Sequence, residues 1–262
     1  MKKLCLSIVL LASLSHAATA QEAAQGGARK IDECGDIQIS DWLARADNFA
    51  IELQNAPAAK GYIVAYGVPN KFPGWPLRRA YQIKGYLIAG RGLQAERVEV
   101  VNGGYRDAVM FQLWVVESGA QLPLPPFDLG AALSRERTPL LFDRFYPHDT
   151  QPSTDIDAGY EGYLDAIKAR FEPFAQALRS DPAARGCVIV YSSHRDRRGA
   201  DRRLAARQKR QILTTHSLDP ARVAALAGGR RNSRAVELWI VPPGSPLPKP
   251  TPTARPARRR RR

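Results

Sequence analysis

The apolar residues of the chain fall into short continuous runs and longer helix-like repeats that alternate along the sequence. Residues 61–66 form a continuous apolar run, which is typical of a strand buried on both faces. The segment before it carries apolar side chains at the three- and four-residue spacing of an amphipathic helix: Leu43, Ala46, Phe49, Ala50 and Leu53. Ser40 and Asp41 are candidate N-caps of that helix, and Pro57 stops it.

The same pattern predicts a complete small unit in the first half of the chain. An opening strand at 30–34 precedes the helix, a second helix follows at about 77–89, and two further strands follow at 97–101 and 109–116. The element order is then βαβαββ. This order predicts an α/β (α+β) domain with two helices on one face of a mixed sheet.

This unit occurs twice, because the second half repeats the first at a fixed offset of 125 residues without a gap. The matched segments include Pro57–Gly61 with Pro182–Gly186, Arg97-Val98 with Arg222-Val223, Gly103-Gly104 with Gly228-Gly229, Arg106 with Arg231, and Leu113–Val116 with Leu238–Val241. The opening strand of the second copy is expected at 140–146. We therefore predict two tandem domains, at 21–118 and 139–243.

The remaining segments are rich in proline. Residues 119–138 are interpreted as a Pro-rich linker with a short helix at 129–135, and residues 244–262 as an extended, solvated tail that ends in five arginines.

The N-terminus has the form of a secretory signal. Lys2 and Lys3 precede the short apolar run 4–14, and Ala18-Thr19-Ala20 is a small-x-small cleavage site, so the mature chain is expected to start at Gln21. The alternative is a membrane anchor, but the apolar run is short for a bilayer. We expect an exported protein that is periplasmic or associated with the outer membrane.

Two cysteines, Cys34 and Cys187, remain after the expected cleavage. In an oxidising compartment they could form a disulfide that joins the two domains. The alternative is that both are small core residues, since free cysteine buries well. The sequence leaves both readings open.

The net charge of +14 is concentrated toward the C-terminal end. Residues 194–234 hold twelve basic and three acidic residues, and the segment after Val241 holds seven basic residues and no acid. The densest group lies in the second helix of the second copy and in the segment just before it: Arg195, Arg197, Arg198, Arg202, Arg203, Arg207, Lys209 and Arg210. This density exceeds what solubility requires and predicts an anionic partner such as peptidoglycan or lipopolysaccharide. Nucleic acid is not an expected partner.

Several short motifs resemble the OmpA-like, peptidoglycan-binding domains of bacterial outer-membrane proteins. Leu141–Phe145 is similar to that family's opening F-D-x-x strand, residues 193–199 (SHRDRRG) to its G-H-T-D-x-x-G, and residues 79–87 (RAYQIKGYL) to its R-A-x-x-V-x-x-Y-L. Residues 232–238 (NSRAVEL) are similar to its closing N-R-R-V-E-I. The resemblance implies tandem degenerate OmpA-like domains.

In that family an aspartate and an arginine bind the diaminopimelate of the peptidoglycan stem peptide, the carboxylate taking the ammonium and the guanidinium gripping a carboxylate. This chain splits the pair, with Arg79 matching the arginine in the first copy and Asp196 the aspartate in the second. Leu204 stands at the arginine's position in the second copy, with Arg203 and Arg207 nearby. The resemblance implies Arg79, Asp196, Arg203 and Arg207 as ligand-binding candidates.

No catalytic, metal or cofactor motif is recognised. The histidines of the mature chain, His148, His194 and His216, lack partners at metal-ligand spacing, and no G-x-S-x-G or phosphate loop occurs. Trp114 and Trp239 stand at equivalent strand positions, where a binding platform is the alternative, and we expect them to pack in the cores. Phe72 and Trp75 lie in the loop that corresponds to the family's ligand loop, where exposed aromatic rings could stack on a ligand.

The favoured hypothesis is a non-catalytic envelope binding or structural protein that engages peptidoglycan or another anionic polymer. Two alternatives stay open, a periplasmic protein-interaction scaffold and an enzyme with an unrecognised site.

Overall fold

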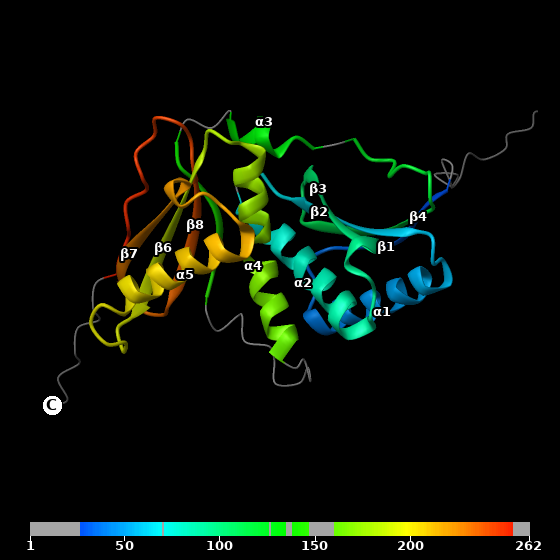
Figure 1. Ribbon diagram of the computed structural model, residues 1–262, viewed down its shortest axis with the longest axis horizontal. Coiled ribbons are helices and arrows are strands. Elements are labelled where there is room, and N and C mark those ends of the chain that lie inside the picture. The colour runs from blue at the N-terminus through cyan, green and yellow to red at the C-terminus, as the bar shows by residue number, and fades with distance from the viewer. Residues whose placement is uncertain (1–26, 70, 126, 135–137, 147–159, 254–262) are drawn as a thin grey trace, which may run out of the picture.

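The computed structural model describes residues 27–69, 71–125, 127–134, 138–146 and 160–253, which form two four-stranded mixed sheets and five helices (Figure 1). The first domain contains β1 Ala28–Cys34, α1 Ile39–Asn55, β2 Lys60–Gly67, α2 Gly74–Arg91, β3 Val98–Tyr105 and β4 Met110–Val116. The second contains β5 Leu140–Phe145, α4 Tyr160–Ser180, β6 Arg185–Ser193, α5 Ala200–His216, β7 Val223–Arg231 and β8 Ala235–Val241, and α3 Leu129–Ser134 lies between the domains in sequence. The predicted α/β class and βαβαββ order are confirmed in both copies.

The two sheets have the same topology. Their strand orders are β1-β4-β2-β3 and β5-β8-β6-β7, and only the pairs β2–β3 and β6–β7 are parallel. Each parallel pair is joined by a crossover helix, α2 or α5, as parallel strands require. The register repeats as well, since Tyr62 pairs with Trp114 and Cys187 pairs with Trp239.

The central strands are buried on both faces, as their continuous apolar runs predicted. In β6, Val188 and Val190 pack into the core beneath α4 and α5, while Cys187, Ile189 and Tyr191 pack into a second cluster on the other face. We call that second side, away from the helices, the open face. Trp114 and Trp239 are both half-buried, and Trp239 packs against the open-face cluster.

One repeated arginine closes the first helix of each domain. The Nη2 of Arg97 donates to the carbonyl oxygens of Leu53, Ala56 and Ala59 at 2.8, 2.8 and 3.0 Å. The Nη2 of Arg222 makes the same three bonds, 125 residues on, to Leu178, Asp181 and Ala184 at 2.6, 2.8 and 2.8 Å. The end of a helix leaves carbonyls without partners, so a guanidinium there satisfies several at once. This role explains why the repeat retains the arginine.

The domains pack through α2, which lies against α4 and β5 in the middle of the molecule (Figure 1). Helix α2 is buried on several sides, including Leu77, Ala80 and Ile83. Gly74, at its start, lets the backbone approach Phe142, because a Cβ there would lie 2.5 Å from the ring. A helix that is apolar on several sides is typical of a buried element, and α2 is buried because two domains share it.

A buried ion pair crosses this interface. The Nε of Arg78 lies 2.7 Å from Oδ2 of Asp143, and the two residues are 8% and 1% exposed. Burial raises the pKa of the Asp143 carboxyl, and the guanidinium of Arg78 opposes that rise. Arg144, the next residue, places its guanidinium 5.3 Å from the ring centre of Phe72 in the first domain. Phe72 and Trp75 are half-buried, so the expectation of freely exposed rings in this loop is wrong.

The equivalent aspartate of the first domain makes a local pair instead. Asp32 and Asp143 both follow the irregularity in the opening strand, and each accepts a hydrogen bond from the backbone N–H of the next residue, at 2.7 and 2.8 Å. Asp32 pairs with Arg45 of its own domain at 2.6 Å, in a pair that is partly exposed. The same position therefore serves a local contact in one domain and the domain interface in the other.

The Pro-rich segment after β8, which the structure describes to Thr253, returns alongside β7 (Figure 1). Thr253 N–H donates to the Arg230 carbonyl at 2.9 Å, and Leu247 packs on the open-face cluster. Residues 244–253 thus differ from the solvated tail that we expected. The terminal arginines, the signal segment 1–20 and His148 lie outside the described residues.

Neither described cysteine forms a disulfide. Cys34 packs at the edge of the first-domain core, and Cys187 is buried on the open face of the second. Burial raises the pKa of the Cys34 thiol to about 11 and of the Cys187 thiol to about 12. The two cysteines therefore match the alternative prediction, in which both are small residues packed against the cores. The described parts of the chain also contain no helix that is long and apolar enough to cross a membrane.

Arg78→Ala is expected to lower the free energy of unfolding by about 3–5 kcal/mol, because it leaves the Asp143 carboxylate buried without its partner. Arg45→Ala, the matched control, removes a partly exposed pair and is expected to cost about 1 kcal/mol or less. Urea unfolding followed by tryptophan fluorescence measures both. We further expect the Arg78 variant to unfold in two separated transitions, because the domains lose their shared contact. Equal losses in the two variants would contradict the assigned role of the interface pair.

Candidate functional site

The strongest charge concentration of the described surface lies on α5 and the loop before it. Only Ala205, Ile212 and His216 of α5 are buried, while Leu204 and Leu213 pack partly against the core. The polar side chains of α5 therefore face solvent. Helix α2, its counterpart in the first copy of the repeat, packs against the other domain instead. This difference decides which of two equivalent helices presents a free surface.

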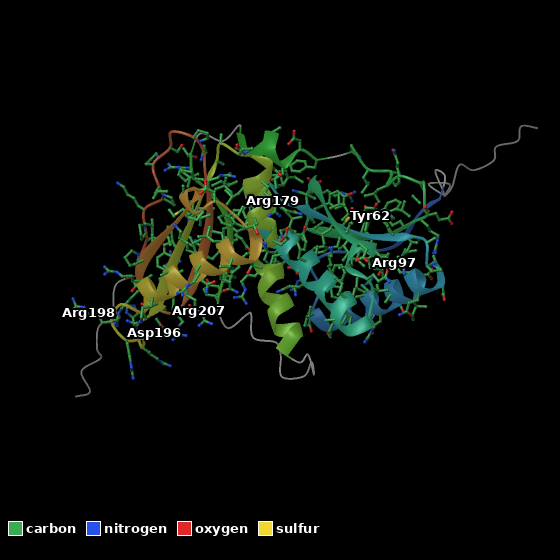
Figure 2. All side chains as sticks on the ribbon, in the orientation of Figure 1. Tyr62, Arg97, Arg179, Asp196, Arg198 and Arg207 are labelled. Atoms are coloured by element: carbon green, nitrogen blue, oxygen red, sulfur yellow. The ribbon has the colours of Figure 1, made fainter. Side chains whose placement is uncertain are left out.

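The cationic side chains of this surface are mostly exposed, and the described residues supply them with no acid partner. We call it the α5 cationic surface, and it comprises Arg195, Arg197, Arg198, Arg202, Arg203, Arg207, Lys209 and Arg210. All except the half-buried Lys209 are exposed. Lys209 donates to the Pro220 carbonyl at 3.1 Å and Arg203 to the Arg198 carbonyl at 3.5 Å. Within the described ranges, none of the eight forms an ion pair. Figure 2 shows the region of Arg198 and Arg207 at the outer end of the second domain.

The field at this end of the molecule favours anions for two reasons. Arg195, Arg197 and Arg198 lie in the loop that leads into the first turn of α5, where the helix presents its unpaired N–H groups and the positive end of its dipole. Asp201, in the first turn of α5, forms no ion pair with these arginines in the described residues, and its Oδ2 accepts a hydrogen bond from Gly229 N–H at 3.0 Å. Exposed guanidinium groups bind phosphate and carboxylate in bidentate fashion, so this surface suits a polyanion.

Asp196 anchors the loop instead of standing open to a ligand. Its carboxylate accepts two hydrogen bonds from Arg234, with Nε at 2.8 Å, and one from Ser193 N–H at 2.7 Å. Arg230 adds bonds to the carbonyl oxygens of His194 and Asp196 at 3.1 and 3.2 Å. The hydrogen bonds from Arg234 hold the pKa of Asp196 below its ordinary value. Two arginines from β7 and the β7–β8 turn therefore fix the loop that carries the cationic side chains.

The four ligand residues predicted from the sequence do not form one site in the structure. Arg79 is half-buried on α2 of the first domain, where burial lowers its pKa and Asp36 partly offsets this effect. Asp196 lies in the second domain and is labelled in Figure 2 beside Arg198. Among the described residues no contact joins Asp196 to Arg79, Arg203 or Arg207. A ligand site for these four residues stays a prediction.

The sequence analysis missed a second polar constellation, which occurs once on each open face. In the second domain, Tyr191 OH donates to Glu237 at 3.1 Å, and the guanidinium of Arg231 lies 3.3 Å from the Tyr191 ring centre. Trp239 Nε1 donates to Glu237 at 3.2 Å. Arg144 and Arg231 also form ion pairs with Glu237 at 2.8 and 2.9 Å.

The first domain has the same group at the same offset. Tyr66 OH and Trp114 Nε1 donate to Gln112, both at 3.1 Å, and the guanidinium of Arg106 lies 3.9 Å from the Tyr66 ring centre. Gln112 replaces the glutamate, and Glu33 on the edge strand accepts from it at 2.6 Å. The repeated Tyr-Trp-Arg positions in the aligned sequences were the signal that could have found both groups.

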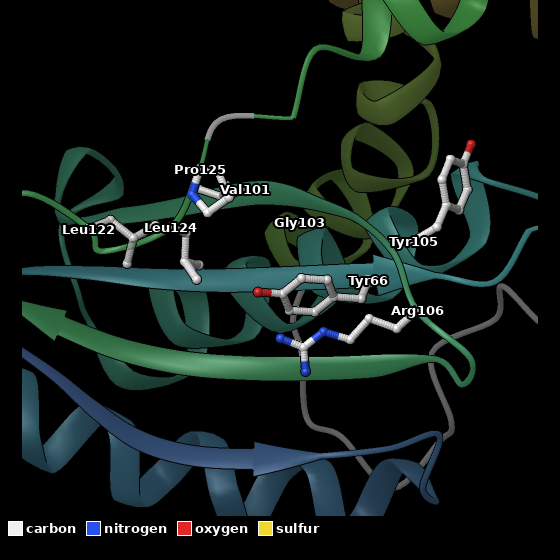
Figure 3. Close-up of a pocket in the computed structure, with 8 residues that line it drawn as sticks. All are labelled: Tyr66, Val101, Gly103, Tyr105, Arg106, Leu122, Leu124 and Pro125. Carbon is white, nitrogen blue, oxygen red and sulfur yellow. The ribbon is translucent and has the colours of Figure 1, made fainter. Parts of the chain in front are cut away.

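A cavity of about 440 Å³ opens beside the first of these groups. Tyr66, Arg106 and Gly103 line it from the sheet, and Leu122, Leu124 and Pro125 line it from the segment after β4 (Figure 3). Its volume lies within the range of small-ligand sites, roughly 300–1,000 Å³.

The remaining candidates have structural roles. His216 is buried and its Nδ1 lies 2.9 Å from Glu172 of α4, so it joins two helices of one domain. No group of histidine, cysteine, aspartate and glutamate in the described ranges is arranged to hold a metal ion. No family model matches the chain, and no curated protein matches it. The resemblance to OmpA-like domains therefore depends on the quoted motifs and stays an interpretation.

Arg234→Ala is expected to raise the pKa of Asp196 toward its ordinary value, since it removes the two guanidinium hydrogen bonds. Carboxyl-carbon NMR over an acid titration measures this, and Arg207→Ala is the control that should leave Asp196 unchanged. The folded pKa is depressed, so the pair's contribution to stability is complete above about pH 4, where Asp titrates in the unfolded chain, and is lost as pH falls through the folded value. An unchanged Asp196 titration in Arg234→Ala would contradict the pair.

Proposed function

We propose that the protein is a non-catalytic binding protein of the bacterial cell envelope, whose α5 cationic surface holds an anionic polymer such as peptidoglycan or lipopolysaccharide. The observation that carries the proposal is the run of exposed arginines at the outer end of the second domain, for which the described part of the chain supplies no acid partner. The secretory signal in the sequence supports the compartment, because an exported basic protein meets these polymers first.

The energetics of α5 support a partner outside the chain. Arg203 and Arg207 lie one turn apart, and like charges at this spacing cost a helix about 0.2–0.5 kcal/mol per pair. The first domain shows the usual alternative, since its exposed cations Arg29, Lys60 and Arg91 each pair with an acid at 2.7 Å. These three exposed cations of the first domain are therefore neutralised within the chain, whereas the described residues supply no acid partner for the cations of the α5 cationic surface.

A general polyanion surface is better supported than a specific stem-peptide site. An ammonium ligand at Asp196 would have to replace Arg234, which holds the carboxylate with two hydrogen bonds. The loss of that pair would also release the loop that carries Arg195, Arg197 and Arg198. We therefore propose recognition through charge and phosphate or carboxylate density.

A protein-interaction scaffold is the second candidate. The observation that favours it is the pair of polar groups on the open faces, one of them beside a cavity. The buried interface between the domains would hold such surfaces in a fixed relation.

Co-sedimentation with purified sacculi and with lipopolysaccharide vesicles tests the proposal. Replacing Arg202, Arg207 and Arg210 with glutamine is expected to lower the affinity by about tenfold, taking about 0.5 kcal/mol for each exposed charge contact. The control replaces Arg29, Lys60 and Arg91 with glutamine, which removes the same charge elsewhere and is expected to change binding little. Binding by the native chain should weaken steeply as salt rises.

Equal losses in the two triple variants would mean that only net charge matters and would remove the assigned surface. Salt-resistant binding that fails in Asp196→Asn and Arg79→Ala would instead support the stem-peptide site. Absence of binding to both polymers would overturn the envelope-polymer proposal.

A further inference from the structure

The Pro-rich segment after β8 is held against the second domain by specific hydrogen bonds. We call residues 244–253 the C-terminal strap. Thr251 N–H donates to Tyr191 OH at 3.1 Å, the carbonyl of Thr251 accepts from Arg231 Nε at 3.1 Å, and its Oγ1 accepts from Arg231 Nη2 at 2.6 Å. The strap therefore has a defined position beside the end of β7 (Figure 1).

The end of the strap and the start of α5 contact the same residues of β7. Pro252 packs over Gly229, where a Cβ would lie 3.0 Å from the proline ring, and Gly229 N–H donates to Asp201 in the first turn of α5 at 3.0 Å. Thr253 N–H donates to the Arg230 carbonyl at 2.9 Å. The last described residue of the strap thus lies beside the end of β7 that also holds α5.

The same end of β7 fixes the loop that leads into α5. The guanidinium of Arg230 donates to the carbonyl oxygens of His194 and Asp196 at 3.1 and 3.2 Å, and the carbonyl of Arg231 accepts from His194 N–H at 3.2 Å. This loop carries three of the arginines of the α5 cationic surface. The strap and the cationic loop therefore share one anchor, the last residues of β7.

This anchor determines where the last arginines of the chain are attached. The nine residues that follow Thr253 include six arginines, Arg255 and Arg258–Arg262, and no acid. Nine residues reach at most roughly 30 Å when fully extended. Helix α5 has 17 residues and is therefore about 25 Å long. The chain is long enough for its terminal arginines to reach the α5 cationic surface from their attachment at Thr253.

Two groups of positive charge attached this close to each other repel, and the described residues supply no acid between them. A small anion neutralises a few of these charges. A linear polyanion that spans both groups neutralises more of them, and once it is bound to one group it meets the other at an effective concentration in the millimolar range.

We propose that the C-terminal strap seats the terminal arginines beside the α5 cationic surface, so that one linear polyanion at least as long as α5 binds both groups. This inference rests on the proposed function of the α5 cationic surface. It adds the length of the ligand, the contribution of the terminal arginines and a role for the strap as their tether.

The test is calorimetric titration of the chain from Gln21 onward with long-chain inorganic polyphosphate and, as a short probe, with triphosphate. Replacing Arg258–Arg262 with glutamine is expected to lower the affinity for the long polymer by about tenfold or more, because the second contact is lost. The affinity for triphosphate should fall much less, since this anion is too short to span both groups. The first-domain triple variant described above is the control and should bind both probes as the native chain does.

The strap is tested by replacing Thr251 and Thr253 together with proline, which removes both N–H donors and both hydroxyls. Both residues are exposed, so the fold should tolerate the change. The tether of the arginines then starts near Gly244 and is about twice as long, which should lower the affinity for the long polymer by about threefold. The matched variant with serine at both positions keeps the donors and should bind as the native chain does.

The possible results separate this inference from the proposed function. If replacing Arg202, Arg207 and Arg210 with glutamine weakens binding while the variant of Arg258–Arg262 binds the long polymer normally, the α5 cationic surface stands and the shared site is overturned. If only the variant of Arg258–Arg262 weakens binding, both the proposed function and this inference are overturned. Equal losses for triphosphate and the long polymer would exclude bridging, and native affinity in the proline variant would overturn the role of the strap.

Discussion

The buried ion pair between Arg78 of α2 and Asp143 of β5 determines how the two domains sit against each other. A buried charge without a partner costs several kcal/mol of desolvation free energy, about 3–5 when one partner is removed. The helix and the strand must therefore lie where Arg78 and Asp143 contact each other. Gly74 permits the close approach that the pair requires, because no side chain keeps α2 away from Phe142. The burial of α2 then leaves its counterpart α5 as the free crossover helix. The position of the α5 cationic surface thus follows from a contact in the other part of the molecule.

The two domains show how a duplicated framework takes different roles at equivalent positions. Arg97 and Arg222 keep the same structural contacts, because the carbonyl ends of α1 and α4 need a donor in both. The open-face groups have diverged in charge: Glu33 with Gln112 in the first domain corresponds to Arg144 with Glu237 in the second. In the second domain the chain's own threonine completes the group, and in the first a cavity stands beside it. The same three conserved positions, a tyrosine, a tryptophan and an arginine, thus have different surroundings in the two domains.

The α5 cationic surface and the polar group at Tyr66 and Arg106 lie in different domains and depend on different interactions. The α5 cationic surface works through unpaired exposed charge, which is long-ranged and sensitive to salt. The group at Tyr66 and Arg106 consists of directed contacts at short range, which salt affects less.

Much of the fold could be predicted from the sequence, because strand and helix periodicity and the 125-residue repeat are local or self-evident patterns. The element order, the sheet class, the helix-side cores and the basic segment before and within α5 were all readable in this way. The hydrogen-bond and ion-pair partners of the charged side chains could not be predicted in this way. Asp32 and Asp143 have the same local setting, yet one pairs with Arg45 in its own domain and the other with Arg78 across the interface. The commitment of Asp196 to Arg234, the return of Thr251 to Tyr191 and the cavity at Arg106 likewise join residues far apart in the chain. Sequence patterns determined which elements form, and tertiary structure decided which charges are neutralised, because an ion pair depends on distance in space and not along the chain.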